Sequence, residues 1–267
     1  MNTPICDFVN NYASKCPVRM HMPGHKGASL LGYEKFDITE IAGADDLYHP
    51  ESIVLESEEN SSALFGCPTY YSTEGSSQCI RAMLYLCILN ASTTNTSDAA
   101  SDTDLNSRPL VLAGRNSHQT FLTAAALLDL DVEWLYGSSS STYLSLDISA
   151  SSIREAIEGA SRKPVCVYLT SPDYLGNIVD VKAISEVCHE LGVLLVIDNA
   201  HGAYLRFLPE ESQHPIDLGA DICCDSAHKT LPVLTGGAYL HLSDEMNVRL
   251  GEYVKSSMAM FGSTSPS

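Results

Sequence analysis

The sequence has little positive charge. Its 267 residues include 15 Lys and Arg against 33 Asp and Glu, which gives a formal net charge of −18. A surface of this sign lacks the basic patch that nucleic acids need, and it is repelled by anionic lipid. We therefore expect neither nucleic acid nor a membrane as a partner.

Long apolar runs and secretion signals are also lacking. No apolar stretch has the roughly 20 residues that a membrane-spanning helix needs. The opening MNTPICDFVNNYASKC has neither the basic start nor the apolar centre of a signal peptide. The nine cysteines are odd in number and form no C-x-x-C pair. These features predict a cytoplasmic protein with reduced thiols.

Clusters of metal ligands are not evident in the sequence either. His21 and His25 lie four residues apart, but a proline and a glycine between them prevent a shared helix face. Cys223 and Cys224 are adjacent on an expected strand, where neighbouring side chains point to opposite faces. We expect no metal site and interpret the buried thiols as structural.

Short apolar runs that alternate with helix-like segments are what the sequence does contain. The expected strands cover 69–73, 109–114, 132–136, 164–170, 193–200, 220–226 and 236–242, and the expected helices cover 75–89, 117–130, 152–160 and 181–192. The runs are continuously apolar, as in a parallel sheet covered by helices on both faces. The pattern predicts an α/β fold, a three-layer αβα arrangement with a mostly parallel sheet and ligands at the carboxyl ends of its strands.

One polar segment interrupts this alternation. Residues 90–108, NASTTNTSDAASDTDLNSR, are rich in Ser, Thr, Asn and Asp and show no periodicity. Such a composition is typical of a loop. We expect a mobile surface loop here.

Polar residues follow three of the expected strands. Gly75, Ser76 and Ser77 lie where a strand turns into a helix, and the amides and hydroxyls at such a turn can bind an anion. Serine is also a preferred N-cap residue, and for this motif taken alone an ordinary helix cap is the commoner role. Asp198 ends an apolar strand, where a carboxylate needs a cation or a donor. Its alternative role is a helix cap or a structural ion pair.

Lys229 lies between GADICC and LPVLTGG, two stretches with the composition of a core. A partly desolvated amine has a lowered pKa and attacks carbonyls, whereas a structural lysine extends to solvent. An anion cradle, a carboxylate and a lysine together are what pyridoxal phosphate needs for its phosphate, its ring nitrogen and its aldehyde. We expect this cofactor to be bound covalently at Lys229.

At these residues the sequence resembles the ornithine/lysine/arginine decarboxylases of the aspartate-aminotransferase fold. SAHKTLP downstream of D-x-AHG is highly specific, and the similar stretches cover nearly the whole chain in order. They are MPGHKG (22–27), DITEIAGADDLYHPES (37–52), EGSSQCIRAML (74–84), GRNSHQT (114–120), LTSPDYLGNIVDVKAI (169–184), VIDNAHGAYL (196–205) and GADICCDSAHKTLPVLTGGAYLHL (219–242). The resemblance implies decarboxylation of lysine, arginine or ornithine to the amine and carbon dioxide, with pyridoxal phosphate as cofactor.

The resemblance also implies roles by position. Lys229 would hold the cofactor as a Schiff base, Asp198 would pair with the ring nitrogen, and His118 would stack on the ring. The alternative role for His118 is that of a histidine at a helix start with a local hydrogen bond. His228 and Lys229 are both candidate proton donors to Cα. The remaining cofactor contacts would come from Gly75, Ser76, Ser77, Ser226 and His228 at the phosphate, and from Ala200 and His201 near the ring.

The chain departs from the resembled pattern at four positions. Asn199 stands where glutamate is usual and Asp225 where glutamine is common. Asp173 replaces a small or hydroxyl residue, and Ser52 replaces a glycine. None of the four removes a cofactor ligand, and they bear on substrate choice and rate.

The resemblance further implies an N-terminal arm over residues 1–30 and an incomplete cofactor-binding major domain over residues 31–267, with the C-terminal small domain absent. Members of the family work as homodimers or higher homo-oligomers with sites at the subunit interface. We therefore expect little decarboxylase activity from the 267-residue chain alone. Aminotransferase or lyase chemistry on the same fold and a truncated, non-catalytic paralogue are the alternatives.

Overall fold

A seven-stranded sheet runs through the chain. The structure is a computed structural model and describes residues 2–95 and 108–263. The strand order is β1-β7-β6-β5-β4-β2-β3, and only β7 runs antiparallel to its neighbours. The strands are β1 (Thr69–Ser72), β2 (Leu110–Gly114), β3 (Asp131–Leu135), β4 (Cys166–Thr170), β5 (Leu194–Asp198), β6 (Ile222–Asp225) and β7 (Ala238–Leu242).

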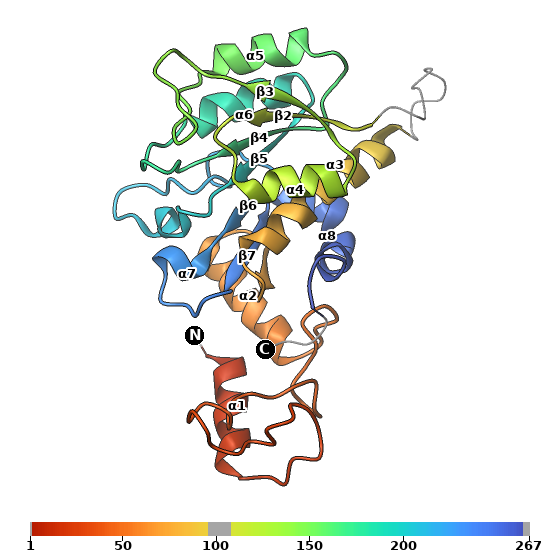
Figure 1. Cartoon of the computed structure of the whole chain (residues 1–267), viewed down its shortest axis with the longest axis vertical. Coiled ribbons are helices and arrows are strands. Elements are labelled where there is room, and N and C mark those ends of the chain that lie inside the picture. The colour runs from red at the N-terminus through yellow and green to blue at the C-terminus, as the bar shows by residue number, and fades with distance from the viewer. Residues whose placement is uncertain (1, 96–107, 264–267) are drawn as a thin grey trace.

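Helices cover both faces of this sheet (Figure 1). Side chains of α3, α4 and α8 fill one hydrophobic core, and those of α5 and α6 fill the other. The predicted three-layer α/β fold with a mostly parallel sheet is confirmed. The helices are α1 (Pro4–Ser14), α2 (Ile53–Phe65), α3 (Ser76–Asn95), α4 (Gln119–Leu127), α5 (Ala150–Gly159), α6 (Val181–Glu190), the 3₁₀ helix η1 (Ala203–Phe207), α7 (Ala227–Thr230) and α8 (Asp244–Ala259).

The central strands are buried on both sides. Every residue of β2, β4 and β5 is buried, which explains why these runs are continuously apolar. Cys224 belongs to the core beneath α3 and α8, whereas Cys223 belongs to the core beneath α6. The prediction that these two thiols point to opposite faces is confirmed.

The carboxyl ends of the parallel strands meet at one edge of the sheet. Thr170 at the end of β4 is the register partner of Asp198 at the end of β5, and Asp198 is in turn the partner of Cys224 in β6. Because β1 runs in the same direction, its carboxyl end leads into α3 at the same edge. The topology therefore brings together the three strand ends at which the sequence carries polar residues.

The polar segment 90–108 is partly helical. Residues 90–95 continue α3, so the prediction of a loop is wrong for them, and residues 96–107 lie outside the described part of the chain. Ser92 Oγ donates to Ile88 O (3.0 Å) and Thr93 Oγ1 donates to Asn90 O (2.9 Å). These bonds within the helix satisfy hydroxyls that would otherwise compete with its backbone.

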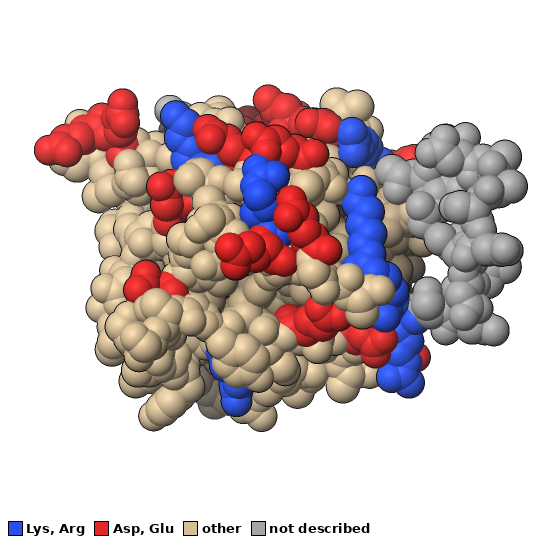
Figure 2. Space-filling view, turned by 90° about the horizontal axis from the view of Figure 1, so that it is seen from above, with Lys and Arg blue, Asp and Glu red and all other residues tan. Residues whose placement is uncertain are grey.

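Acidic and basic side chains lie beside one another on the face shown in Figure 2. Around α5 and α6, Arg154 contacts Glu158 and Glu190. Nearby, Arg162 contacts Asp131. Among the described residues no helix is both long and apolar enough to cross a membrane.

Candidate cofactor site

Hydroxyl groups from three segments gather at the start of α3. Ser226 Oγ, which follows β6, donates to Ser76 Oγ at 2.7 Å. Ser77 Oγ lies 3.1 Å from Thr120 Oγ1 in α4. α3 is 20 residues long, and the positive end of its dipole and its free backbone amides point at this place. The arrangement suits an anion such as a phosphate.

Two glycines shape the turn that precedes α3. Gly75 has φ +73° and donates its N–H to Gly236 O at 2.7 Å. A Cβ at Gly236 would lie 2.6 Å from the carbonyl oxygen of Thr73, so only glycine fits there. A Cβ at Gly75 would meet nothing within 4 Å, so the space in front of the helix is open on that side.

Asp198 is a buried carboxylate held by donors. Its side chain is 2% exposed at the end of β5. The Ala200 N–H donates to Oδ1 (3.2 Å), the Tyr168 hydroxyl donates to Oδ2 (3.1 Å), and the Cys224 thiol lies 3.8 Å from Oδ1. Burial and the charge of Asp198 raise the pKa of Tyr168 well above its usual value, so the phenol keeps its proton. The expectation that this carboxylate needs donors is met.

The amine of Lys229 lies beside an imidazole. Nζ is 3.0 Å from Nε2 of His201, and the lysine is exposed. Burial and the neighbouring charge of Lys229 lower the pKa of His201. The imidazole is therefore neutral at pH 7, and its Nε2 can accept a hydrogen bond from the ammonium group.

The environment of Lys229 differs from the sequence expectation in one respect. The stretch before it is buried, but residues 231–237 after it are largely exposed, with Leu234 at 89%. The prediction of a lysine between two buried stretches is therefore wrong for the second one. The physical reason is that α7 is a single turn at the edge of the sheet and packs no second layer over the lysine.

His118 and His228 each have a local hydrogen bond. His118 caps α4, because its Nδ1 accepts the N–H of Thr120 at 3.1 Å, and its side chain is otherwise exposed. The alternative role considered for this histidine is thus present, and stacking on a ring stays a prediction. His228 Nδ1 lies 3.2 Å from Gly237 O.

An unpartnered hydroxyl lies next to Asp198. Thr170 is 4% exposed and is the register partner of Asp198, and its Oγ1 has no hydrogen-bond partner within residues 2–95 and 108–263. An anion cradle, a buried carboxylate, a free hydroxyl and an amine are the donor set that pyridoxal phosphate requires, so the residues fit this cofactor. Tyr168 and Thr170 were not predicted as site residues. They are alternate residues at the end of β4, next to β5, so they lie on the same face of the sheet, and this spacing could have identified them.

A second buried cluster surrounds Asp225. Asn199 Nδ2 donates to Asp225 Oδ1 (2.6 Å), and Nε2 of His214 and Nε2 of His241 each lie 3.2 Å from Oδ2. All four side chains are fully buried. The two residues that replace the usual glutamate and glutamine, Asn199 and Asp225, thus contact each other.

The same cluster changes one sequence expectation. His214, Cys223 and Asp225 place one ligand-type atom each within 4.8 Å of the others, a set that could hold a metal ion. The prediction that metal ligands do not cluster is therefore wrong for these residues. The sequence gives no sign of the cluster, because His214 comes from the loop after η1 and joins β6 only in the fold.

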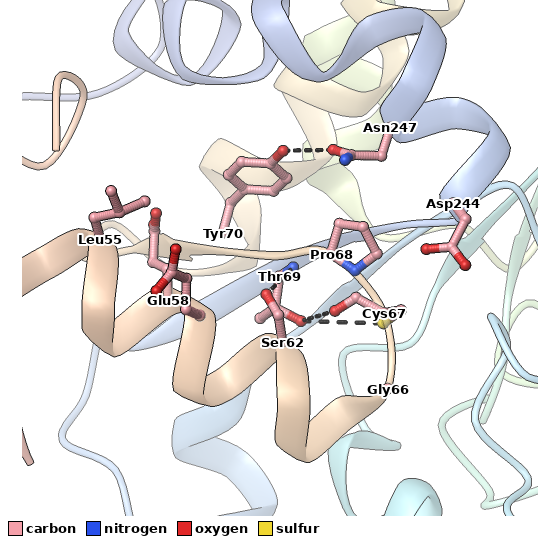
Figure 3. Close-up of a pocket in the computed structure, with 11 residues that line it drawn as sticks. Leu55, Glu58, Ser62, Gly66, Cys67, Pro68, Thr69, Tyr70, Asp244 and Asn247 are labelled. Carbon is pink, nitrogen blue, oxygen red and sulfur yellow. Dashed lines mark hydrogen bonds between the residues drawn. The ribbon is translucent and has the colours of Figure 1, made fainter. Parts of the chain in front are cut away.

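A surface pocket of about 450 Å³ lies elsewhere (Figure 3). It is lined by one side of α2, the start of β1 and the start of α8, and Tyr70 donates to Asn247 within it (2.6 Å). Since the carboxyl end of β1 leads to Ser76, the start of β1 is at the opposite edge of the sheet. The pocket is therefore separate from the candidate cofactor site.

Comparison with known proteins identifies the relatives of the chain. The family described as "Orn/Lys/Arg decarboxylase, major domain" matches residues 3–267. The uncharacterised protein YaaO of Bacillus subtilis (strain 168) is 28% identical over 95% of this chain and 52% of its own length. An arginine decarboxylase of Bacillus cereus is 25% identical over 99% of this chain and 56% of its own length.

Solved structures show the same fold. The lysine decarboxylase LdcF of Francisella novicida superposes with a TM-score of 0.76 at 19% identity, over 98% of this chain and 38% of that protein. The chain spans about half the length of the curated relatives that it matches.

Proposed function

Because the chain belongs to the Orn/Lys/Arg decarboxylase family, we propose that it forms the cofactor-binding part of a pyridoxal-phosphate-dependent decarboxylase. The proposed substrate is a basic amino acid, namely lysine, arginine or ornithine, and the products are the amine and carbon dioxide. The observation that carries the proposal is the meeting of the Ser76–Ser226 hydroxyls, the buried Asp198 carboxylate and the Lys229 amine at one edge of the sheet.

The residues at this edge of the sheet would each bind a different part of the cofactor. The amides at the start of α3, with Ser76, Ser77, Ser226 and His228, would hold the phosphate. Lys229 would bind the aldehyde, Asp198 would pair with the ring nitrogen, and His118, Ala200 and His201 would surround the ring. When bound, the protonated ring supplies an electron sink for the bond that breaks at Cα.

Asp198 would keep a proton on the ring nitrogen. Its charge lies in a buried environment, where electrostatic interactions are stronger than in water. The hydroxyl of Tyr168 and the N–H of Ala200 each donate to a different oxygen of the carboxylate, so its orientation is fixed. A carboxylate placed in this way needs no rearrangement when it meets a cationic N–H.

Lys229 would need to lose a proton before it attacks the aldehyde, since only the neutral amine is nucleophilic. Nε2 of His201 is the proton acceptor within hydrogen-bond distance. The proton that later returns to Cα would come from Lys229 or His228, which lie next to each other in α7.

The assembly, location and domain limits of the protein are part of the proposal. We propose a homodimer or larger homo-oligomer, a cytoplasmic location, an arm over residues 1–30 and the major domain over residues 31–267. Val18, Met20 and Leu31 are more than four-fifths exposed, and apolar side chains in such numbers on one segment favour packing against another subunit.

Product analysis tests the reaction type. The chain is loaded with pyridoxal phosphate and incubated with lysine, arginine and ornithine in turn, with Lys229→Ala as the control. We expect any turnover to release amine and carbon dioxide in equal amounts. Lys229→Ala should release neither product. Keto acid instead of carbon dioxide would show an aminotransferase. Cofactor bound at Lys229 without any product would show a non-catalytic chain.

A further inference from the structure

Asp225 lies behind the candidate cofactor site, on the other face of the sheet. Cys224, the register partner of Asp198, directs its sulfur to within 3.8 Å of the Asp198 carboxylate. Successive side chains of a strand point to opposite faces, so Asp225 points away from that carboxylate. On that face its carboxylate is hydrogen-bonded to the side chains of Asn199, His214 and His241. We name these four residues the Asp225 hub.

The hub joins segments that carry the cofactor-site residues. Asn199 directly follows Asp198, and Asp225 directly precedes Ser226, which begins the turn that bears Lys229. The hydrogen bond from Asn199 Nδ2 to Asp225 Oδ1 is 2.6 Å long and ties these two strand ends side chain to side chain. The end of β5 is further bound to β6 by Asn199 N–H, which donates to Cys224 O at 3.0 Å.

The two histidines anchor the hub to the rest of the molecule. His241 comes from β7 and His214 from the loop after η1. The ring of Phe65, at the end of α2, packs against both, with centroid distances of 4.6 Å to His241 and 5.7 Å to His214. The carboxylate is thus held by Asn199 after β5, by His241 in β7 and by His214 in the loop after η1.

We propose that Asp225 is a positioning residue for the cofactor site, which sets Asp198 at the end of β5 relative to the Ser226–Lys229 segment through its hydrogen bond with Asn199. The proposal rests on the proposed binding of pyridoxal phosphate. Its physical basis is that the ring nitrogen and the aldehyde carbon belong to one rigid ring. The carboxylate and the lysine that bind them must therefore keep a fixed separation, and errors of about 1 Å in placement can cost on the order of a hundredfold in rate.

An amide cannot replace the Asp225 carboxylate without loss. Burial alone would raise the pKa of Asp225, but the two imidazoles beside it lower that pKa well below its usual range, so the group is ionised. Its Oδ2 accepts a hydrogen bond from Nε2 of each histidine. If Asn stood here with its NH₂ toward the histidines, both ring protons would have to move to Nδ1, and among the described residues Nδ1 of His214 has no hydrogen-bond partner. If its NH₂ pointed to Asn199 instead, it would face the Nδ2 that now donates to Asp225 Oδ1.

Asp221, which directly precedes the strand of Asp225, offers a matched control. It is also a buried carboxylate, and it accepts the N–H of Leu195 (2.7 Å) and lies 3.1 Å from Nε2 of His189. It precedes β6 and lies at the opposite edge of the sheet from the cofactor site. Asp221→Asn therefore removes a buried carboxylate and its histidine bond without touching the Asp225 hub.

The experiment compares the original chain, Asp225→Asn and Asp221→Asn. Affinity for pyridoxal phosphate is measured by absorbance titration, and the fixed orientation of the ring by the visible circular dichroism of the bound cofactor. Thermal unfolding reports stability separately. We expect Asp225→Asn to bind the cofactor at least tenfold more weakly and to lose most of the visible dichroism. Asp221→Asn should keep both within twofold, even where it is equally destabilised.

A second variant covers the case in which Asp225→Asn does not fold. Asn199→Ala leaves the carboxylate, both histidines and the backbone bond to Cys224 in place and removes only the side-chain bond between the strand ends, so it should show the same loss of dichroism. Normal affinity and dichroism in either folded variant would overturn the proposal. One equivalent of bound metal in the purified chain would also overturn it, because the hub would then be a metal site. If the original chain itself does not bind the cofactor at Lys229, it is the proposed function that fails.

Discussion

Nζ of Lys229 and Nε2 of His201 lie 3.0 Å apart, at the edge of the sheet where the polar strand ends meet. Nδ1 of His201 lies 3.4 Å from the carbonyl oxygen of Pro172. The imidazole ring packs against the ring of Tyr174, with the two centroids 5.3 Å apart. With a proton on Nδ1 directed to that carbonyl, Nε2 is left as an acceptor. The pair therefore has the geometry for moving a proton off the lysine.

His201→Ala should slow the attachment of pyridoxal phosphate to Lys229. The ammonium group would lose the neighbouring acceptor, and positioned acid–base groups contribute roughly a hundredfold or more to rate. Because Lys229 is exposed and water can partly substitute, we expect a slowing of at least ~10-fold. Stopped-flow absorbance after mixing with the cofactor measures this rate. His49→Ala, at an exposed histidine in the N-terminal segment, is the control, and equal rates for both variants would contradict the role of His201.

Asp198→Ala should separate attachment from turnover. The amine at Lys229 is untouched, so the cofactor should still be attached there and reducible by borohydride. Turnover of any active preparation should fall by about a hundredfold or more, which corresponds to roughly 3 kcal/mol of barrier, because the ring nitrogen would lose its partner. Amine production measures the loss. Activity close to that of the original protein would show that Asp198 does not act at the ring nitrogen.

Lys255 and Glu58 form a buried ion pair between α8 and α2 whose loss should be costly. Lys255 Nζ also donates to Leu47 O (2.8 Å), and Glu58 also accepts the N–H of Tyr71 (2.8 Å). Burial lowers the pKa of Lys255 and raises that of Glu58. Lys255→Met should lower the free energy of unfolding by about 3 kcal/mol or more, since a buried carboxylate would remain unpaired.

The double variant Glu58→Gln/Lys255→Met checks the cause of this loss. It removes the unpaired charge and should recover much of the stability, as measured by chemical denaturation. If the double variant were as unstable as Lys255→Met or less stable, lost packing rather than the unpaired charge would be responsible.

Asp45 should make stability depend on pH below about 4. Its partial burial alone would raise its pKa, but backbone N–H groups of Asp46, Glu51, Ser52 and Val54 lower it to about 2. A lowered folded-state pKa means that its contribution is complete above the unfolded value of about 3.9 and is lost as the pH falls through about 2. Asp45→Asn should cost about 1 kcal/mol at pH 7, because the amide NH₂ cannot accept the hydrogen bonds at the start of α2.

Denaturation at pH 7, 4 and 2 tests this dependence. The difference in stability between the original chain and Asp45→Asn should narrow as the pH falls from 4 to 2. Asparagine tolerates the φ of +72° at this position, so the comparison is free of added backbone strain. A difference that stayed constant with pH would exclude the carboxylate as its source.

The layer arrangement and the strand ends of the site were predictable from sequence because they depend on local patterns. Continuous apolar runs mark β2, β4 and β5, Asp198 ends β5, and Ser76 begins the helix that follows β1. Helix α8 was not predicted, although the sequence contains the signals of a capped amphipathic helix there. Ser243 caps it by accepting the N–H of Met246 (3.2 Å), and its buried residues Met246, Leu250 and Val254 recur every four residues.

The contacts between distant segments could not be predicted in the same way. His214 and Asp225 meet because the loop after η1 folds back onto β6, a tertiary event with no periodic signal. The exposure of Lys229 follows from α7 being one turn long at the edge of the sheet, although the apolar composition of residues 231–237 predicts a core. Both the His214–Asp225 contact and the exposure of Lys229 depend on how distant segments pack, which local composition does not encode.

The position of the covalent bond shows whether Lys229 is the residue that binds pyridoxal phosphate. The chain is incubated with pyridoxal phosphate, reduced with borohydride and digested, and the pyridoxyl group is located by peptide mass spectrometry, with Lys229→Ala treated in parallel. We expect one stoichiometric label on Lys229 and none on the variant. A stoichiometric label on another lysine, or an equal extent of labelling in Lys229→Ala, would contradict it.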